Sequence, residues 1–205
     1  MKQIVYLSAI LAIAVAQNAP APLQARVRIS DPFNDNQIQG NLTFTQLDEH
    51  KVRVEGVIAG LPPGQYGFHV HQKGDITGGC LSTGPHFNPE NKDHGHPNDE
   101  NRHVGDLGNI EFDENSVSRI DFVDSMISLY GPHCILGRAV VLHEKQDDYG
   151  RGRHPDSRKT GNAGGRAACG VIGILNQDNS WNNSAGRSLL APILITAASL
   201  VALLY

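Results

Sequence analysis

Alternating apolar and polar residues recur in short runs through the middle of the chain. In residues 25–29, for example, Ala, Val and Ile alternate with two Arg residues. Runs that alternate or are rich in β-branched residues occupy positions 25–29, 41–44, 52–54, 66–70, 109–112, 117–122, 138–142 and 171–175. Such runs predict short strands, and no long stretch shows the 3.6-residue period of an amphipathic helix. The pattern predicts an all-β domain over residues 23–176, an antiparallel sandwich or barrel of about eight strands.

Two long segments interrupt this succession of strands. Residues 71–106 and 144–168 are rich in Gly, Pro, Asn, Asp and His. Connections longer than about 12–15 residues without structure of their own are usually functional or disordered. We therefore expect two long functional loops attached to the β domain.

The first 16 residues, 1–16, predict a secretory signal peptide. Lys2 precedes an apolar run, and Ala14-Val15-Ala16 supplies small residues at a cleavage point. The alternative is an N-terminal membrane anchor, but the run is shorter than the roughly 20 residues that a spanning helix needs. The sequence therefore indicates the secretory pathway and an extracellular location.

The last residues, 188–205, form an uncharged hydrophobic tail. No Lys or Arg follows the tail, although basic residues are usual on the cytosolic side of a transmembrane anchor. Small residues lie just upstream, at 183–186, within a polar linker over residues 177–187. This arrangement favours a GPI-attachment signal and membrane attachment at the cell surface. A plain tail anchor and an interfacial segment are the alternatives.

Composition narrows the partners and the redox compartment. The net charge is −4, and removal of both ends takes away Lys2 and Arg187, which leaves 15 basic residues against 21 acidic ones, a net charge of −6. This balance offers no basic surface for nucleic acid. In an exported protein the three cysteines allow at most one intramolecular disulfide and one free thiol. The sequons Asn41-Leu42-Thr43 and Asn182-Asn183-Ser184 could accept glycans in that compartment.

Histidine is the residue type that stands out. Six of the ten histidines fall between His69 and His103. Since His69 and His71 are two residues apart on a predicted strand, their imidazoles share one face and can reach one ion. Further candidate ligands lie downstream: His86, His94, His103, Asp106 and His143. Six imidazoles and a carboxylate are enough for two metal sites, and imidazole suits copper and zinc.

Six motifs carry a resemblance to a known family. In chain order they are Gly67-Phe68-His69-Val70-His71, Gly84-Pro85-His86-Phe87-Asn88-Pro89, Arg102-His103-Val104-Gly105-Asp106-Leu107-Gly108-Asn109, Gly137-Arg138-Ala139-Val140-Val141-Leu142-His143-Glu144, Gly161-Asn162-Ala163-Gly164 and Ala168-Cys169-Gly170-Val171-Ile172-Gly173. In these motifs the chain resembles the copper/zinc superoxide dismutases. The resemblance implies an eight-stranded antiparallel Greek-key barrel or sandwich, immunoglobulin-like, with two long functional loops.

The resemblance also assigns ligands. It implies that copper is bound by His69, His71, His86 and His143. It implies that zinc is bound by His86, His94, His103 and Asp106, with His86 as a bridging imidazolate. Asp147 matches a carboxylate that links ligands of the two metals, and Cys80 and Cys169 match the family's disulfide, which leaves Cys134 free.

The activity that the resemblance implies is superoxide dismutation. With one copper and one zinc per subunit, superoxide is converted to dioxygen and hydrogen peroxide by Cu(II)/Cu(I) cycling. Arg166 matches the residue that holds the anion, and His86 can serve as a proton source. Lys159 matches a guiding lysine, and Thr160 matches a threonine that narrows the channel. The alternative is a non-catalytic copper-binding or copper-delivering module of the same fold.

The oligomeric state and the roles of a few polar residues are the last features to consider. Residues 170–174 resemble the family's dimer-contact strand and predict a homodimer, although Lys73 stands where family dimers pack an apolar residue. His96 could replace His94 as a zinc ligand, and the sequence assigns no role to His154 or Cys134.

Overall fold

The structure is a computed structural model that describes residues 23–31 and 37–175. Within these ranges the chain forms nine strands and two short helical turns. The strands are β1 (Gln24–Ser30), β2 (Gln39–Asp48), β3 (Lys51–Ala59), β4 (Gly64–His71), β5 (Asp106–Phe112), β6 (Val117–Asp124), β7 (Ala139–His143), β8 (Arg166–Val171) and β9 (Gly173–Ile174). All paired strands run antiparallel.

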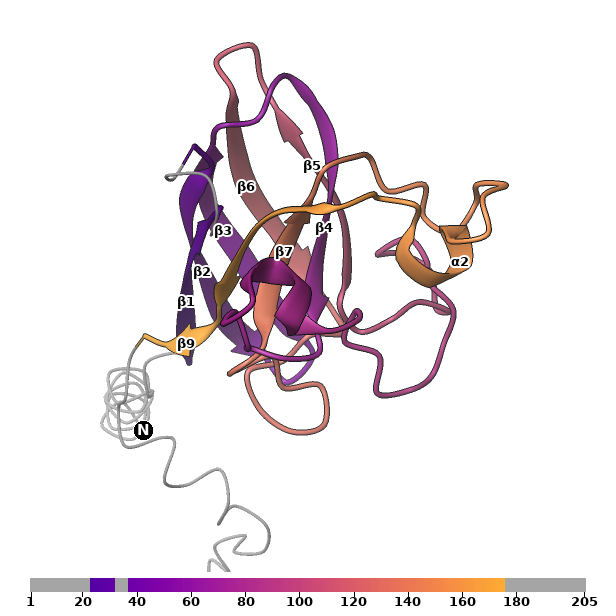
Figure 1. Ribbon diagram of the computed structural model, residues 1–205. Helices are drawn as coiled ribbons and strands as arrows, with labels where there is room; N and C mark the ends of the chain where they lie inside the picture. The colour runs from indigo at the N-terminus through magenta and orange to yellow at the C-terminus, as the bar shows by residue number, and fades with distance from the viewer. Residues whose placement is uncertain (1–22, 32–36, 176–205) are drawn as a thin grey trace, which may run out of the picture.

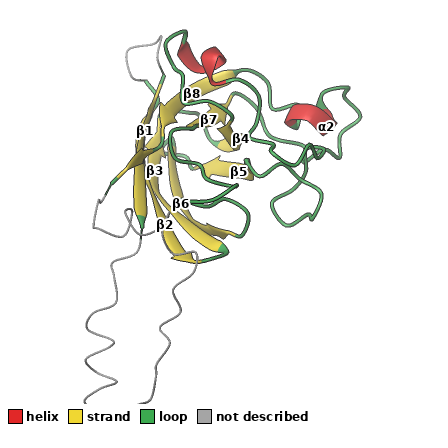
Figure 2. Ribbon diagram, turned by 90° about the horizontal axis from the view of Figure 1, so that it is seen from below, coloured by secondary structure: helices red, strands yellow, loops and turns green. Residues whose placement is uncertain are grey.

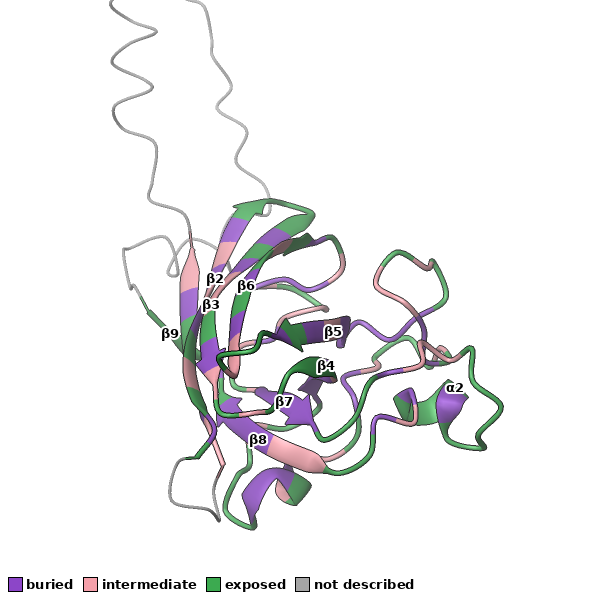
Figure 3. Ribbon diagram, turned by 90° about the horizontal axis from the view of Figure 1, so that it is seen from above, coloured by how far each residue is buried: buried purple, intermediate pink, exposed green. Residues whose placement is uncertain are grey.

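The strands lie in the order β5-β4-β7-β8-β1-β2-β3-β6, and β9 pairs with β1. Figures 1 and 3 show β1, β2, β3 and β6 along one wall and β4, β5 and β7 along the other. Within the described residues no ladder joins β5 to β6, so the barrel is nearly closed rather than fully closed. The pairing of β4 with β7 and of β8 with β1 gives crossover connections of the Greek-key type. The predicted all-β antiparallel barrel is confirmed.

Side-chain alternation builds the core between the two walls. In β1 the apolar Ala25, Val27 and Ile29 are buried, whereas the arginines between them are exposed. In β4 and β7 the pattern differs, because every residue over 67–71 and 139–143 is buried. One face of these two strands meets the core, and the long loops cover the other, as Figure 2 shows. Polar side chains on that covered face are therefore removed from solvent.

The last strands lie earlier than the sequence pattern predicts. The prediction of one strand over 171–175 is wrong: β8 begins at Arg166, and only Gly173–Ile174 forms a separate short strand. Ala167, Ala168 and Gly170 are weak strand formers, so the pattern gives no signal there. They are extended because β8 fits between β7 and β1, where Cys169 pairs with both Val141 and Ser30.

The two long loops contain little regular structure. The first holds a 3-10 turn, η1 (Gly79–Thr83), and the second a single helical turn, α2 (Ser157–Thr160). Figures 1 and 2 show α2 well away from the β1–β2–β3 wall. No helix among the described residues is long and apolar enough to cross a membrane. The segments 1–16, 177–187 and 188–205 lie outside the described residues, so the signal peptide, linker and tail stay predictions.

Candidate metal centre

Irregularities in the ladders coincide with two of the histidines. The β4–β5 register shifts between Gly67 and His69, and the β7–β8 register shifts between Leu142 and His143. Such bulges re-aim side chains and are common beside active sites. The extra residue of each bulge lies on the partner strand, β5 or β8, and strand alternation places His69, His71 and His143 on the loop-covered face of the sheet.

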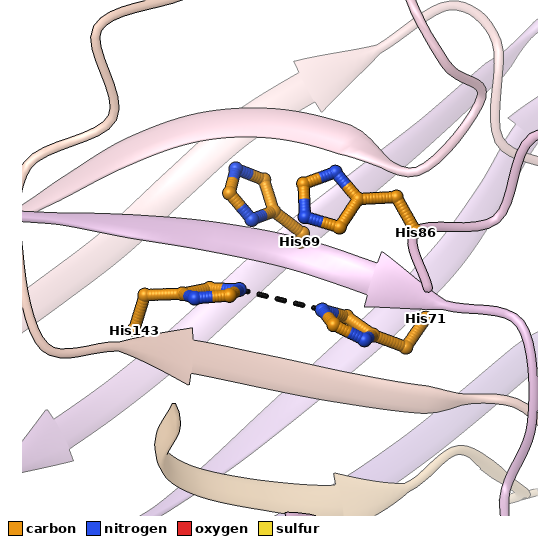
Figure 4. Close-up of side chains that lie close together, drawn as sticks. All are labelled: His69, His71, His86 and His143. Carbon is orange, nitrogen blue, oxygen red and sulfur yellow. Dashed lines mark hydrogen bonds between the residues drawn. The ribbon is translucent and has the colours of Figure 1, made fainter. Parts of the chain in front are cut away.

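Four imidazoles converge on this face. One ring nitrogen from each of His69, His71, His86 and His143 lies within 4.8 Å of the others, and all four residues are buried. Figure 4 shows the rings gathered beside β4 and β7, with Nε2 of His71 3.3 Å from Nε2 of His143. His86 enters from the first loop, which pairs with the end of β4 at His71. The predicted copper ligands therefore meet in space.

Hydrogen bonds fix which nitrogen of each ring is free. Nδ1 of His71 donates to the carbonyl of Gly84 at 2.7 Å, and Nδ1 of His143 faces the carbonyl of Gly164 at 3.3 Å. Nε2 of His69 donates to Asp147 at 2.8 Å. The opposite nitrogens of these three rings then carry lone pairs that point into the cluster. Among the described residues, Nδ1 of His69 and Nε2 of His86 are buried without a hydrogen-bond partner. Buried unpartnered ring nitrogens are costly, and a metal ion would satisfy them.

A second group of four donors adjoins the first. It consists of His86, His94, His103 and Asp106, all buried. Oδ1 of Asp106 lies 3.0, 2.9 and 3.1 Å from the Nδ1 atoms of His86, His94 and His103 respectively. A tetrahedral zinc with ligands at about 2.0–2.1 Å requires donors roughly 3.3 Å apart. The predicted zinc ligands therefore have a spacing that fits zinc with little adjustment.

His86 and Asp147 connect the two groups. His86 turns Nδ1 toward Asp106 and leaves Nε2 on the side of the four-imidazole group. The buried Asp147 accepts from Nε2 of His69 through Oδ2 and from Nε2 of His94 through Oδ1, each at 2.8 Å. A carboxylate in this position fixes the tautomer and orientation of both rings. The close grouping of His69, His94 and Asp147 is explained by this bridge and requires no third ion.

The protonation of the cluster suits metal binding. Burial holds the pKa of His69, His71 and His86 below its usual range. Burial, together with the nearby His86, lowers the pKa of His143 to about 3. These four imidazoles are therefore neutral at physiological pH and can donate lone pairs. For Asp106, burial acts to raise the pKa, but hydrogen bonds from His103, His86 and His94 outweigh it and keep the carboxyl ionised.

Arg166 lies at the edge of the four-imidazole group, opposite His143 in the β7–β8 register. Its Nη1 donates to the carbonyl of Cys80 at 2.6 Å and to Oγ1 of Thr83 at 2.9 Å. Its Nη2 donates to the carbonyl of Gly84 at 2.7 Å. Cys80 and Cys169 form the disulfide, and Cys134 is free, as the family resemblance predicts. The disulfide-linked loop thus fixes the position of the Arg166 guanidinium.

The remaining predicted residues lie farther out. Lys159 lines a surface cleft of about 550 Å³ that is also lined by His86 and His103. Thr160 is exposed at the end of α2, and its hydroxyl donates to the carbonyl of Asp156. His96 stands outside the donor group that contains His94 and packs against the ring of Tyr149, while His154 is exposed.

Two supporting residues stand in the family motifs, but the sequence assigns neither of them a role. Arg102 is buried and links the carbonyl of Asp106 to the carboxylate of Asp124. Gly161 lies so close to Asp147 and His94 that a Cβ atom would overlap the bridging carboxylate. Both depend on contacts between segments far apart in the chain, which a single sequence does not display.

Comparison with known proteins gives consistent matches. Residues 38–172 match the family model of copper/zinc superoxide dismutase (SODC). The extracellular Cu-Zn superoxide dismutase of Drosophila melanogaster is 51% identical over 164 residues, which cover 78% of this chain and 91% of that protein. Cu-Zn superoxide dismutase A of Xenopus laevis is 57% identical over 137 residues, covering 67% and 90%.

A solved structure matches as well. The crystal structure of the clock protein EA4 superposes with a TM-score of 0.72 at 69% sequence identity, covering 77% of this chain and 98% of that one. Both relatives above are named superoxide dismutases, which favours the enzyme over a non-catalytic copper-binding module. Because the matched residues 38–172 include every donor of the two groups, the chain belongs to the copper/zinc superoxide dismutases, oxidoreductases that act on superoxide with copper and zinc as their metals.

Proposed function

We propose that the four-imidazole group binds copper, that the group with Asp106 binds zinc, and that superoxide is dismutated at the copper position. The observation that carries this assignment is the shared His86, whose two ring nitrogens face the two groups. An all-imidazole set suits copper, whereas three imidazoles and a carboxylate suit tetrahedral zinc. Bound copper supplies the redox chemistry, because it can accept an electron from one superoxide and pass it to a second.

Arg166 binds and orients the anion in this proposal. A guanidinium stays charged at any relevant pH and presents donors in a fixed fork. The hydrogen bonds to Cys80, Leu81, Thr83 and Gly84 use Nη1 and Nη2. Among the described residues Nε makes no hydrogen bond, so its N–H group is left to donate to superoxide.

His86 moves a proton in this proposal. Its Nδ1 faces the zinc group and would hold zinc, so only Nε2 is free to exchange a proton. A proton taken up at Nε2 after the first half-reaction can be given to the peroxide formed in the second. General acids that are positioned in this way contribute about 10²–10⁴-fold to a rate.

Local charge attracts the anion although the chain is acidic overall. The cleft that His86 lines also contains four cations and one carboxylate: Lys92, Arg138, Arg158, Lys159 and Asp93. Basic clefts raise association rates of anions by roughly 10–10³ and do so less at high salt. We assign Lys159 to guidance because it stands on the rim beside His86, and Thr160, the next residue, to the width of the approach.

Several observations support the location that we propose. The signal-like segment 1–16 and the similarity to a relative that is named extracellular both support export. The tail 188–205 supports attachment at the cell surface through a GPI anchor or a tail anchor. Release of the full-length protein from membranes by a phosphatidylinositol-specific phospholipase would identify a GPI anchor, and retention would favour a tail anchor.

A homodimer is the association state that we propose. Val171 and Ile174, on the segment that resembles the family's contact strand, are exposed apolar residues. Exposed apolar groups of this kind are typical of subunit interfaces. Sedimentation of the wild type and of the Val171→Lys variant would test the homodimer. We expect a dimeric wild type and a weakened dimer in the variant, and a monomeric wild type would overturn the proposal.

One experiment tests the activity. Residues 17–183 are expressed, copper and zinc per chain are measured, and superoxide decay is followed for the wild type and two variants. His143→Ala removes a proposed copper ligand, while His154→Ala removes an exposed imidazole as a matched control. We expect decay to be fast in the wild type and in H154A and to be lost in H143A. Equal decay in wild type and H143A would overturn the assignment of copper.

A further inference from the structure

We propose that a clasp between the two long loops positions the helical turn α2 beside the cleft through which the anion enters. The clasp consists of two residues from the first loop and two from the second: His96, Asp99, Tyr149 and Arg151. Neither Tyr149 nor Arg151 lines that cleft, so both are positioning residues rather than groups that touch the anion. The inference rests on the proposed function, which assigns guidance of superoxide to Lys159 on α2.

An ion pair forms one half of the clasp. Nη2 of Arg151 lies 3.0 Å from Oδ1 and 3.1 Å from Oδ2 of Asp99, so the guanidinium of the second loop faces both carboxylate oxygens of the first. Hydrogen bonds from the backbone N–H of His96 and from Arg151 hold the pKa of Asp99 below its usual range. The carboxylate is therefore ionised at neutral pH, and the pair carries both of its charges.

A contact between two rings forms the other half. The centroids of the His96 imidazole and the Tyr149 phenol ring lie 4.6 Å apart with the planes at 67°, an edge-to-face arrangement that aromatic rings favour. Tyr149 has a φ of +60°, a left-handed conformation that is rare for residues other than glycine. Such a conformation persists where surrounding contacts hold it, and the ring of His96 supplies such a contact.

The first-loop side of the clasp is a single turn fixed to the barrel. The backbone N–H of Asp99 donates to the carbonyl of His96 at 2.8 Å, and the N–H of His96 donates to Oδ2 of Asp99 at 3.1 Å. Nδ1 of His96 accepts from the N–H of Asn98 at 3.0 Å, which sets the orientation of the ring. Pro97 packs so closely against Gly108 of β5 that a Cβ atom on this glycine would lie 2.9 Å from Cγ of Pro97. The clasp therefore connects the second loop to a turn that is anchored to a strand.

Hydrogen bonds carry the position of the clasp to α2. The backbone N–H of Arg151 donates to the carbonyl of Asp148 at 3.0 Å. The carboxylate of Asp148 accepts from Oγ of Ser157, the first residue of α2, at 2.6 Å. The backbone N–H of Asp148 donates to the carbonyl of Gly161, just after α2, at 2.9 Å. Both ends of α2 are thus tied to the residue that precedes the clasp, so a displacement of residues 149–151 would move the side chains that α2 carries.

The two loops are not packed continuously beside the clasp. A pocket of about 340 Å³ is lined by residues of both loops, among them Asp99, Tyr149 and Arg151. Figure 1 shows α2 at the outer end of the second loop, away from the strands of the barrel. The backbone N–H of His94 also donates to the carbonyl of Arg158 at 2.9 Å, so the clasp is a second attachment between the loops. Breaking the clasp should therefore shift and loosen α2 without unfolding the loop.

A direct effect of charge makes the opposite prediction for one variant. Asp99→Asn removes a negative charge from the first loop, which by itself should speed the association of an anion. The same change breaks the ion pair with Arg151, which should slow association, because α2 no longer holds Lys159 in place. The sign of the change in kcat/KM for D99N therefore separates a clasp from a simple effect of charge.

The test uses the metal-loaded protein and follows superoxide decay, amide hydrogen exchange, and the copper and zinc content. We expect Asp99→Asn and Arg151→Gln to lower kcat/KM for superoxide by roughly threefold at low salt, a small part of the roughly 10–10³ that a basic cleft can contribute. Exchange of the amides at 157–161 should rise in both variants, with both metals retained. Arg153→Gln is the matched control, since Arg153 is exposed on the same loop and makes no ion pair among the described residues. It should lower kcat/KM less and leave the exchange unchanged.

Further variants test whether the effect passes through Lys159 and whether the ring contact contributes. In a Lys159→Gln background, Asp99→Asn should lower kcat/KM by a smaller factor than in the wild type, because the side chain that the clasp positions is already gone. A merely structural role would give the same factor in both backgrounds. Tyr149→Phe keeps the ring and should behave as the wild type. Tyr149→Gly keeps the left-handed backbone without the ring and should resemble D99N.

The outcomes separate this inference from the proposed function. An active wild type with a D99N variant that is equally fast or faster overturns the clasp and leaves the proposed function intact. Unchanged amide exchange at 157–161 in D99N overturns the clasp in the same way. An inactive wild type with both metals bound overturns the proposed function and, with it, the role of the clasp in guiding superoxide, although raised exchange in D99N would still show that the clasp holds α2.

Discussion

The guanidinium of Arg166 is bound to the main-chain carbonyl of Cys80 at 2.6 Å, and Cys80 is itself joined to Cys169 three residues beyond Arg166. The disulfide therefore ties the carbonyl that orients the guanidinium to the strand that carries it. Val141 packs with both cysteines in a small buried cluster beneath this contact. The position of the proposed anion-binding group thus depends on the oxidation state of two cysteines that never touch the substrate.

Loss of the disulfide should lower both stability and catalytic efficiency. The two cysteines are 89 residues apart, and closing a loop of this length stabilises a fold by about 4–5 kcal/mol in the chain-entropy model, as an upper figure. In the variant with Cys80→Ser and Cys169→Ser, the free energy of unfolding, measured with a denaturant, should fall by most of this amount. The kcat/KM for superoxide should fall while bound copper stays near the wild-type level, because Arg166 loses its support.

Cys134→Ser is the matched control for this variant. Cys134 is free and lies outside the Cys80–Cys169 cluster, so its replacement should change neither quantity. A double variant that keeps wild-type kcat/KM would show that Arg166 is positioned without the disulfide.

Gly161 should be irreplaceable for metal retention. Its φ is +66°, and a Cβ atom there would overlap Oδ1 of Asp147 and lie 2.6 Å from Nε2 of His94. Gly161→Ala should therefore displace the carboxylate that orients His69 and His94. Loss of such a supporting partner costs about 10–100-fold in metal affinity. Competition with a chelator, followed by measurement of copper and zinc, checks this.

Gly137→Ala provides the comparison for Gly161→Ala. Gly137 has a φ of +72°, but a Cβ atom there would meet nothing within 4 Å. Both variants carry the backbone cost of a left-handed alanine, about 1–2 kcal/mol. Only G161A adds the clash, so equal metal retention in the two variants would contradict the role given to Gly161.

Local pattern and long-range packing account for different parts of this molecule. Alternation in residues such as Val27 and Ile29 predicts β1, and the spacing of His69 and His71 predicts a shared face, because both depend on neighbours along one strand. β8 could not be predicted in this way, since Ala167 and Gly170 are extended only through pairing with β7 and β1.

The metal centre likewise has features that local pattern predicts and features that depend on long-range packing. The sequence order of the histidines, read through the family motifs, predicts each donor that the structure gathers into the two groups. The close approach of Gly161 to Asp147 and the link from Arg102 to Asp124 join segments distant in the chain. Neither leaves a periodicity or spacing that one sequence could reveal.

The buried pair of Arg102 and Asp124 should matter far more for stability than a similar pair on the surface. Nη2 of Arg102 lies 2.5 Å from Oδ2 of Asp124, and both side chains are almost fully buried. Asp124→Asn leaves the arginine charge buried without its partner, which costs about 3–5 kcal/mol. Asp121→Asn breaks the exposed pair with Arg53 and should have little effect, because solvent screens both charges. Urea unfolding of the metal-free proteins measures the difference, and similar midpoints for the two variants would refute it.

Zinc binding to the metal-free protein should release a proton from His94. Burial acts to lower the pKa of this imidazole, but the carboxylates of Asp106 and Asp147 outweigh burial and raise the pKa to about 9. At pH 7.5 the ring is therefore an imidazolium with a proton on each nitrogen. Zinc displaces the proton on Nδ1, while the proton on Nε2 stays on the bond to Asp147.

The sign of the pH dependence follows from the raised pKa. At any pH well below 9, His94 contributes close to one released proton per zinc, and its contribution disappears as the pH rises through 9. Asp106 adds none, since its pKa is held well below the usual range. Calorimetry in buffers of different ionisation enthalpy counts the protons. The His96→Gln variant, which alters an imidazole outside the donor group, should release the same number. Zinc binding at pH 7.5 with no proton release would show that His94 is already neutral and that the two carboxylates do not act on it as described.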